Sequence, residues 1–191
     1  MITSGIDFTN FKNKKKNTKV SKILFQLLED NSEVIKSLKK SYKSSFSSQQ
    51  LNKYKYFSNF RVIGIGGSSL GTKSIYEFLK NRVKKKFSFV DNLQEQNENN
   101  KKKSVNIVVS KSGNTIETIV NSHIFIKNRN KNIFITENKN NYLYLLAQKL
   151  KSEIIHHNNY IGGRYSVLSE VGMLPAELMG LKSNDFRQLN S

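Results

Sequence analysis

Cysteine is absent from this 191-residue chain, and proline occurs only once. The absence of thiols excludes a disulfide scaffold, a thiolate metal site and a cysteine nucleophile. No apolar run approaches the roughly 18–20 residues that span a membrane, and the first 16 residues lack the apolar core of a secretory signal. We therefore expect a cytoplasmic protein without a membrane segment, with one domain of ordinary size and a small appendage at most.

Acidic residues are also scarce: 14 Asp and Glu stand against 32 Lys and Arg, a net charge of +18. Only five of the basic residues are arginine, and alanine is rare, which is typical of an AT-rich coding sequence. Proteins that bind nucleic acid usually cluster basic and aromatic side chains. The lysine runs at 14–16, 84–86 and 101–103 are scattered instead. We expect solvated surface charge and no nucleic-acid partner.

Hydrophobic spacing predicts an α/β fold behind a helical N-terminal segment. Residues 1–17 form a polar arm, and helical spacing runs from Val20 to Tyr56, with Asn31 as an N-cap and Val34 and Leu38 facing the core. Strands are expected at Arg61–Ile65, Phe87–Val90, Val105–Val109, Asn132–Thr136 and Glu153–His156, and helices at Leu70–Asn81, Thr115–Asn128 and Tyr142–Leu150. Residues 93–104 are a polar connection. This alternation predicts a three-layer αβα sandwich with a parallel sheet.

Two strand-to-helix turns have the composition of an anion site. The first turn, Gly64–Gly71, is rich in glycine and serine, although it matches neither the dinucleotide fingerprint nor the Walker A order. The second turn, Ser110–Thr115, gathers three hydroxyls and an ammonium where a helix begins. Taken alone, the first turn is also explained as a structural tight turn, and the second as a Ser-rich helix N-cap. Together, on parallel strands and without a following Mg²⁺-ligand carboxylate, they favour one shared sugar-phosphate site.

A third stretch, Ile161–Ser169, is here called the arginine turn. Its Gly-Gly pair before Arg164 lets the chain turn sharply and present a guanidinium, which suits an oxyanion that develops during a reaction. An ordinary surface arginine is the alternative, but it would not explain the two glycines.

Three motifs carry a resemblance to a known family. GIGGSSLG (Gly64–Gly71), VSKSGNTIET (Val109–Thr118) and GGRYSVLSEVGMLPAELMG (Gly162–Gly180) closely resemble phosphoglucose isomerase, also called glucose-6-phosphate isomerase. The motifs occur in the family's order, and the third is highly specific to it. The resemblance implies a SIS-like (sugar isomerase), flavodoxin-type domain over residues 57–191, behind the arm and helices of residues 1–56.

The resemblance also implies an activity. The family interconverts glucose 6-phosphate and fructose 6-phosphate in glycolysis and gluconeogenesis, without metal or organic cofactor and generally as a homodimer. By position, the residues that bind the substrate phosphate are Gly67, Ser68, Ser110, Lys111, Ser112 and Thr115. Arg164 matches the arginine that stabilises the enediolate. Gly163 and Glu117 lie near the site, and Glu117 is not the base.

Two groups that isomerisation needs have no match in this sequence. The family's base is a glutamate and its ring-opening acid a histidine, both from segments after the GGRYS motif, whereas this chain stops at Ser191. The histidines here, His123 and the pair His156-His157, match no catalytic motif. We therefore expect an N-terminal fragment that is inactive alone. The alternative is a non-catalytic sugar-phosphate sensor with the same fold, which would need a helix-turn-helix within Val20–Tyr56.

Overall fold

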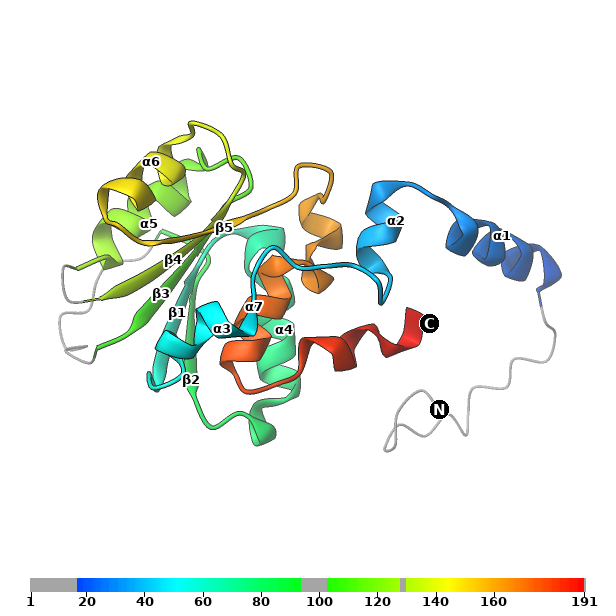
Figure 1. Ribbon diagram of the computed structural model, residues 1–191, viewed down its shortest axis with the longest axis horizontal. Helices are drawn as coiled ribbons and strands as arrows, with labels where there is room; N and C mark the ends of the chain where they lie inside the picture. Colours follow the sequence, from blue (N-terminus) through cyan, green and yellow to red (C-terminus); the bar gives the residue numbers. More distant parts are fainter. Residues whose placement is uncertain (1–16, 94–102, 128–129, 191) are drawn as a thin grey trace.

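The computed structural model describes residues 17–93, 103–127 and 130–190. Helices and strands alternate along the body of the chain, behind a helical segment at the N-terminal end (Figure 1). The helices are α1 (Thr18–Glu29), α2 (Glu33–Leu38), α3 (Ser48–Leu51), α4 (Leu70–Phe78), α5 (Ile116–Phe125), α6 (Tyr142–Lys149) and α7 (Glu170–Leu178). The strands are β1 (Asn59–Ile63), β2 (Lys86–Val90), β3 (Val105–Val109), β4 (Lys131–Thr136) and β5 (Glu153–His156). The 3-10 helices are η1 (Asn52–Tyr54), η2 (Gly66–Ser68), η3 (Lys80–Arg82), η4 (Gly163–Leu168) and η5 (Ser183–Asn190).

The five strands form one parallel sheet in the order β2-β1-β3-β4-β5. The central strand β3 is buried along its whole length, as a β-branched strand covered on both faces should be. Ile63 pairs with Val90 on one side and Val108 on the other, so β1 and β3 end side by side at one sheet edge. The strand order reverses between β1 and β3, and ligands of open α/β sheets bind at such a switch point.

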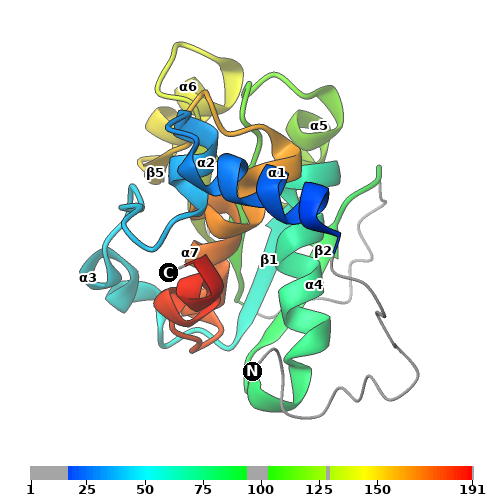
Figure 2. The ribbon, with the colours of Figure 1, turned by 90° about the vertical axis from the view of Figure 1, so that its right-hand side faces the viewer.

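Helices cover both faces of the sheet, as Figures 1 and 2 show from two directions. On one face α3, α4 and α7 pack against side chains such as Val62 and Ile107. On the other face α5 and α6 pack against Val108 and Phe134, because successive strand residues point to opposite sides. The predicted three-layer αβα sandwich with a parallel sheet is therefore confirmed.

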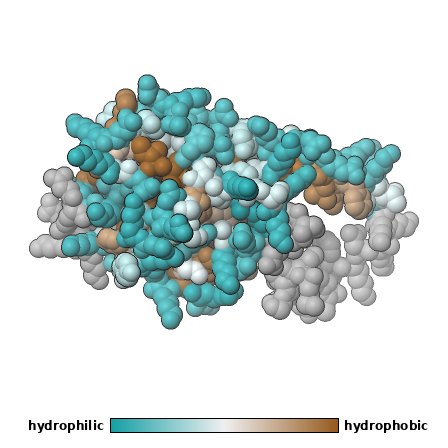
Figure 3. Space-filling model, viewed as in Figure 1, coloured by the Kyte–Doolittle hydropathy of each residue, from teal (hydrophilic) through white to brown (hydrophobic). Residues whose placement is uncertain are grey.

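Helix α1 lies apart from this body, at one end of the molecule's long axis (Figure 1). Its periodic apolar residues are about half exposed, for example Ile23 at 55% and Leu27 at 48%, and they form an apolar surface in Figure 3. In the next helix Val34 and Leu38 are half-buried. Spacing thus predicted a helix correctly, while no residue of α1 is buried within the described part of the chain.

The expected N-cap at Asn31 was wrong. Helix α2 begins after Ser32, whose backbone is extended at the N-cap position. The side chain of Asp30 accepts hydrogen bonds from the Ser32 N–H (2.9 Å) and hydroxyl (3.1 Å). This local turn sets the register of the chain between α1 and α2, so the cap falls one residue later than the sequence indicated.

Several element boundaries also moved. Strand β1 runs over Asn59–Ile63 rather than Arg61–Ile65. Gly64 still donates its N–H to the last residue of β2 (Val90 O, 3.1 Å), and the chain then turns into η2 at Gly66, whose φ is +57°. Helix α4 ends at Phe78 and α5 at Phe125, each earlier than predicted. Residues 1–16, most of the 93–104 connection and residue 128 lie outside the described residues.

Helix α7 was not predicted, although it is almost wholly buried. It contains Pro175, which has no N–H to donate to Val171 four residues earlier. The Thr72 hydroxyl of α4 donates to the Val171 carbonyl instead, at 2.9 Å. Ser169 caps the helix by accepting the Val171 N–H (3.3 Å). Within the described ranges, no helix has the length and apolar character to cross a membrane.

Candidate functional site

The second turn gathers its hydroxyl groups directly after β3. Ser110 Oγ lies 3.0 Å from Thr115 Oγ1 and accepts a hydrogen bond from the Gly113 N–H (3.2 Å). Ser112 Oγ is exposed and accepts from the Asn114 N–H (3.3 Å). Thr115 is the N-cap of α5, so the unpaired N–H groups of the first helical turn follow these hydroxyls. Hydroxyl donors at a helix N-terminus can hold an anion.

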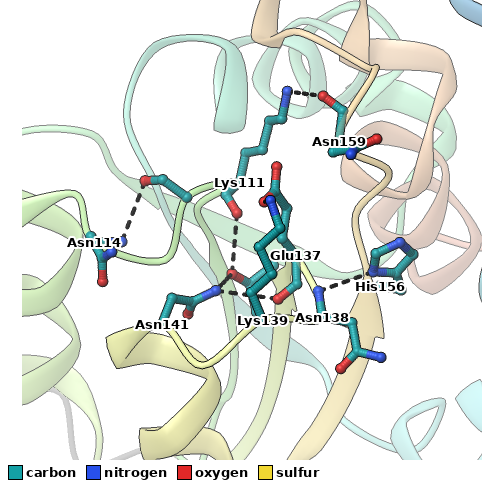
Figure 4. Close-up of polar contacts among 10 residues, drawn as sticks. Lys111, Asn114, Glu137, Asn138, Lys139, Asn141, His156 and Asn159 are labelled. Carbon is teal, nitrogen blue, oxygen red and sulfur yellow. Dashed lines mark hydrogen bonds and ion pairs between the residues drawn. The ribbon is translucent and has the colours of Figure 1, made fainter.

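Lys111 links the second turn to the loop that leads into the arginine turn (Figure 4). Its ammonium donates to the backbone oxygen of Asn159, between β5 and η4. Its own carbonyl accepts the Glu137 N–H (3.1 Å) and the Thr136 hydroxyl (3.4 Å), which fixes the turn to the end of β4. The one ammonium of the second turn therefore lies toward the arginine turn.

Asn141, which the sequence analysis missed, supports the second turn from the β4–α6 side (Figure 4). Gly113 has φ +67°, and a Cβ there would lie 1.8 Å from Asn141 Oδ1, so the turn needs glycine. The same amide caps α6 by accepting the Tyr144 N–H (2.9 Å), and it donates to Thr136 Oγ1 (3.2 Å). An Asn directly before a predicted helix is an N-cap signal that could have identified it.

The first turn touches the arginine turn directly. A Cβ on Gly67 would lie 2.4 Å from the carbonyl oxygen of Gly163, so the two backbones can approach this closely only because residue 67 has no side chain. Ser166 Oγ lies 2.9 Å from the Gly67 carbonyl and 2.8 Å from the Gly163 carbonyl, and its one proton is shared between them. The buried hydroxyl of Ser166 thus joins the two segments.

A pocket of about 450 Å³ lies between these two segments and is lined by Gly67, Leu70, Gly71, Gly163, Arg164, Ser166 and Val167. Arg164 is exposed there. A larger pocket, about 540 Å³, lies at the opposite sheet edge around residues such as Lys53 and Glu153. We place the site at the smaller pocket, because ligands of such sheets bind at the carboxyl ends of the strands.

The remaining predicted residues lie around these turns. Ser68 ends the 3-10 helix η2 of the first turn and is half-buried, and Glu117 is exposed on the first turn of α5. The residues of the second turn do not line the 450 Å³ pocket, so one pocket shared by Ser68, Ser110, Ser112 and Thr115 stays a prediction. Among the described residues, no three His, Asp or Glu side chains gather as a metal ion requires.

The three histidines lie outside that pocket's lining. His123 is exposed, with Nε2 2.6 Å from the Tyr142 hydroxyl, and His156 is exposed, with Nδ1 accepting the Asn138 N–H (3.1 Å). His157 is buried, and its Nδ1 has no hydrogen-bond partner in the described part of the chain. Burial lowers the pKa of the His157 imidazole, and Lys111 acts in the same direction against an opposing effect of Glu170.

Comparison with known sequences gives a consistent result. The sequence model of a family described as phosphoglucose isomerase matches residues 15–189. The glucose-6-phosphate isomerase of Acholeplasma laidlawii is 40% identical over 142 residues, which cover 63% of this chain and 33% of that protein. The chain spans only 26–33% of the length of the first curated relatives it matches.

Solved structures share the fold. A hypothetical protein from Thermus thermophilus superimposes with a TM-score of 0.61 at 21% identity, over 87% of this chain and 46% of that one. The tagatose-6-phosphate ketose/aldose isomerase of Escherichia coli gives a TM-score of 0.56 at 16% identity, over 91% of this chain and 46% of that one. These likenesses show that this chain shares the αβα sandwich fold with both proteins.

Proposed function

Because this chain belongs to the phosphoglucose isomerase family, we propose that it forms the sugar-phosphate-binding part of an enzyme that interconverts glucose 6-phosphate and fructose 6-phosphate. The observation that carries the proposal is the backbone contact of Gly67 with Gly163. That contact joins the arginine turn to the first turn at the switch point of the sheet. A substrate bound there would meet hydroxyl and N–H donors at one end and a guanidinium at the other.

The 6-phosphate is assigned to the first and second turns. Ser110, Ser112 and Thr115 offer hydroxyls, and the N-terminus of α5 offers backbone donors and a favourable dipole. Gly67 lines the pocket, and Ser68 follows it. Lys111 adds a positive charge between the second turn and the arginine turn.

Arg164 is assigned to the reacting end of the sugar. Moving a proton from C2 to C1 passes through an enediolate, whose negative oxygen needs a fixed positive partner. A guanidinium stays charged at every working pH and offers directed donors, so it suits that oxygen better than a lysine would. Arg164 lines the pocket next to Gly163.

The proton-transfer base is assigned to chain outside these 191 residues. Glu117 is exposed on α5, and Glu170 is fully buried, where its carboxylate accepts from Tyr42 and Ser45. Neither carboxylate lines the pocket beside Arg164. Completing the site would therefore take further chain, and the homodimer and cytoplasmic location that the resemblance implies belong to that whole enzyme.

A sugar-phosphate sensor is the less favoured function. A helix-turn-helix needs two packed helices joined by a short turn. Within residues 17–58, which the structure describes, α1 is exposed along its length and α2 has six residues, so these residues offer no such pair. No observation favours the sensor over the isomerase.

Calorimetry tests the phosphate site. Fructose 6-phosphate and inorganic phosphate should bind to the chain, and fructose should not. Thr115→Val should weaken phosphate binding roughly tenfold or more, because a hydrogen bond to a charged group is worth about 1.5–3 kcal/mol. Ser74→Ala, at an exposed serine of α4, is the matched control and should leave binding unchanged. Equal binding of fructose and fructose 6-phosphate would contradict the proposal.

A further inference from the structure

A polar cluster of two buried and two half-buried side chains lies beside the arginine turn and lines no part of the pocket described above. Its members come from four distant segments: Tyr42 between α2 and α3, Asn158 after β5, Glu170 at the start of α7, and Arg187 in η5. Glu170 and Arg187 are 0% and 2% exposed. Charged side chains are rarely buried so completely unless they are paired, so the cluster calls for a physical explanation.

The Tyr42 hydroxyl is the centre of this cluster. It donates to Glu170 Oε1 (2.8 Å) and accepts from Asn158 Nδ2 (2.9 Å). Asn158 stands at the beginning of the segment that carries Arg164, and Glu170 stands at its end. One oxygen atom from the N-terminal segment therefore fastens both ends of residues 158–170.

Two further contacts hold the same arrangement. The Ser45 N–H donates to Glu170 Oε1 (2.8 Å), which ties the loop after Tyr42 to the start of α7. The Arg187 guanidinium lies 5.1 Å from the centre of the Tyr42 ring and donates to the Leu168 carbonyl, two residues before Glu170. A cation over an aromatic face is attracted to it, most strongly when both are desolvated.

The protonation states suit this network. Burial raises the pKa of the Tyr42 hydroxyl well above its usual value, and the Glu170 carboxylate beside it acts in the same direction. Tyr42 therefore keeps its proton and remains a donor to Glu170. Glu170 Oε2 and Arg187 Nε are buried without a hydrogen-bond partner in the described part of the chain, so the Tyr42 hydroxyl bond counts heavily in holding the cluster.

We infer that Tyr42 is the positioning residue of the arginine turn: it fixes both ends of residues 158–170 and thereby holds Arg164 against the first turn. Arg164 itself is exposed, and α2 lies beside η4 in Figures 1 and 2, so the N-terminal segment supports the turn from behind. Fixing the ends of a loop removes alternative conformations, and a misplaced charge stabilises an oxyanion poorly. The positioning of the arginine turn by Tyr42 is argued from contacts within the chain, and only the catalytic role of Arg164 rests on the proposed function.

Amide hydrogen exchange tests the positioning without any ligand. Tyr42→Phe removes the hydroxyl and keeps the ring under Arg187. Exchange of the backbone amides of residues 159–169 should become about tenfold faster, while those of the central strand Val105–Val109 stay as slow as before. Tyr54→Phe, at a buried tyrosine outside the cluster, is the matched control and should leave the exchange of residues 159–169 unchanged. Unchanged exchange of residues 159–169 in a folded Tyr42→Phe chain would overturn the inference.

Fructose 6-phosphate binding separates positioning from general stability. Tyr42→Phe should weaken binding several-fold in the parent chain and have no further effect in an Arg164→Ala chain, because the arginine it positions is then gone. Equal weakening in both chains would mean that Tyr42 acts on stability alone, against the inference. If the parent chain binds no sugar phosphate, the proposed function fails, and the exchange experiment still decides the role of Tyr42.

If Tyr42→Phe does not fold, two substitutions of Glu170 test the same hydrogen bond. Glu170→Gln preserves the volume and an oxygen that can accept the Tyr42 proton, so residues 159–169 should stay nearly as protected as in the parent. Glu170→Ala removes the acceptor and should release the same residues. Equal exchange in the two Glu170 variants would contradict the proposed role of the Tyr42–Glu170 bond.

Discussion

At the residue scale, Gly113 is the position where backbone geometry most tightly constrains the second turn. Its φ of +67° disfavours any side chain, and a Cβ would collide with Asn141 Oδ1. We expect Gly113→Ala to lower the free energy of unfolding by about 2–4 kcal/mol, from left-handed strain plus loss of the α6 cap. Urea denaturation measures this change.

Gly66→Ala is the matched control. Gly66 also has a positive φ (+57°), but a Cβ there meets nothing within 4 Å. Gly66→Ala should therefore lower the free energy of unfolding only through left-handed backbone strain, by about 1–2 kcal/mol. Equal losses for the two variants would show that contact with Asn141 does not constrain the second turn.

His157 should make the stability of the fold depend on pH. Burial lowers the pKa of its imidazole in the folded chain below the unfolded value of about 6.5. Between those two values the unfolded chain binds the extra proton, so the free energy of unfolding falls as the pH drops below about 6.5, by up to about 1.4 kcal/mol per pH unit.

Unfolding measured from pH 7.5 to 5.5 checks this expectation. His157→Gln should remove most of the decline, whereas His123→Gln, at an exposed histidine of α5, should retain it. A decline that persists undiminished in His157→Gln would assign the pH dependence to other groups.

At the scale of elements, helices α4 and α7 are joined by a hydrogen bond that replaces one missing inside α7. Pro175 cannot bond to the Val171 carbonyl, and the buried Thr72 hydroxyl supplies that bond across the two helices. Thr72→Val should lower the free energy of unfolding by about 1–3 kcal/mol, because it leaves a buried carbonyl unsatisfied.

Thr118→Val is the matched control for Thr72→Val. Thr118 is buried in α5, and its hydroxyl oxygen has no partner in the described part of the chain. Removing this hydroxyl should be nearly neutral or slightly stabilising in thermal unfolding. If Thr118→Val is as damaging as Thr72→Val, the loss reflects the shape of threonine and not the bond to Val171.

At the scale of the whole molecule, the proposed function assigns substrate binding to these 191 residues and proton transfer to a base outside them. In the proposed function the turns bind substrate and Arg164 stabilises charge, while general-base catalysis typically adds about 10²–10⁴-fold. We expect no isomerase turnover above background from these 191 residues in a coupled assay of fructose 6-phosphate formation. Adding the downstream segment of a homologous isomerase should restore turnover.

The extended chain also tests Arg164. Loss of one fixed oxyanion partner typically lowers kcat by about 10²–10³-fold, and Arg164→Ala should do the same with a smaller effect on KM. Arg82→Ala, at an exposed arginine of η3, is the control. Robust turnover from the 191 residues alone would place the base among them.

Much of the sandwich could be predicted because its signals are local. Strands β3 and β5 occupy the predicted residues, since β-branched runs bounded by polar turns identify short buried strands. Hydroxyl-rich turns after β1 and β3 were visible for the same reason. The ends of α4 and α5, and the cap at Ser32, depend on single hydrogen bonds that periodicity does not report.

The alternation of elements, the composition of the three turns and the family resemblance can all be read from the amino-acid sequence, because each depends on neighbours within a few residues. Three features are visible only in the folded chain: the apolar side of α1 stays exposed, Asn141 fills the space beside Gly113, and Tyr42 meets Glu170 across 128 residues of chain. Such contacts depend on the order in which strands pair and on which helix covers which face. The residues adjacent in sequence do not predict that packing.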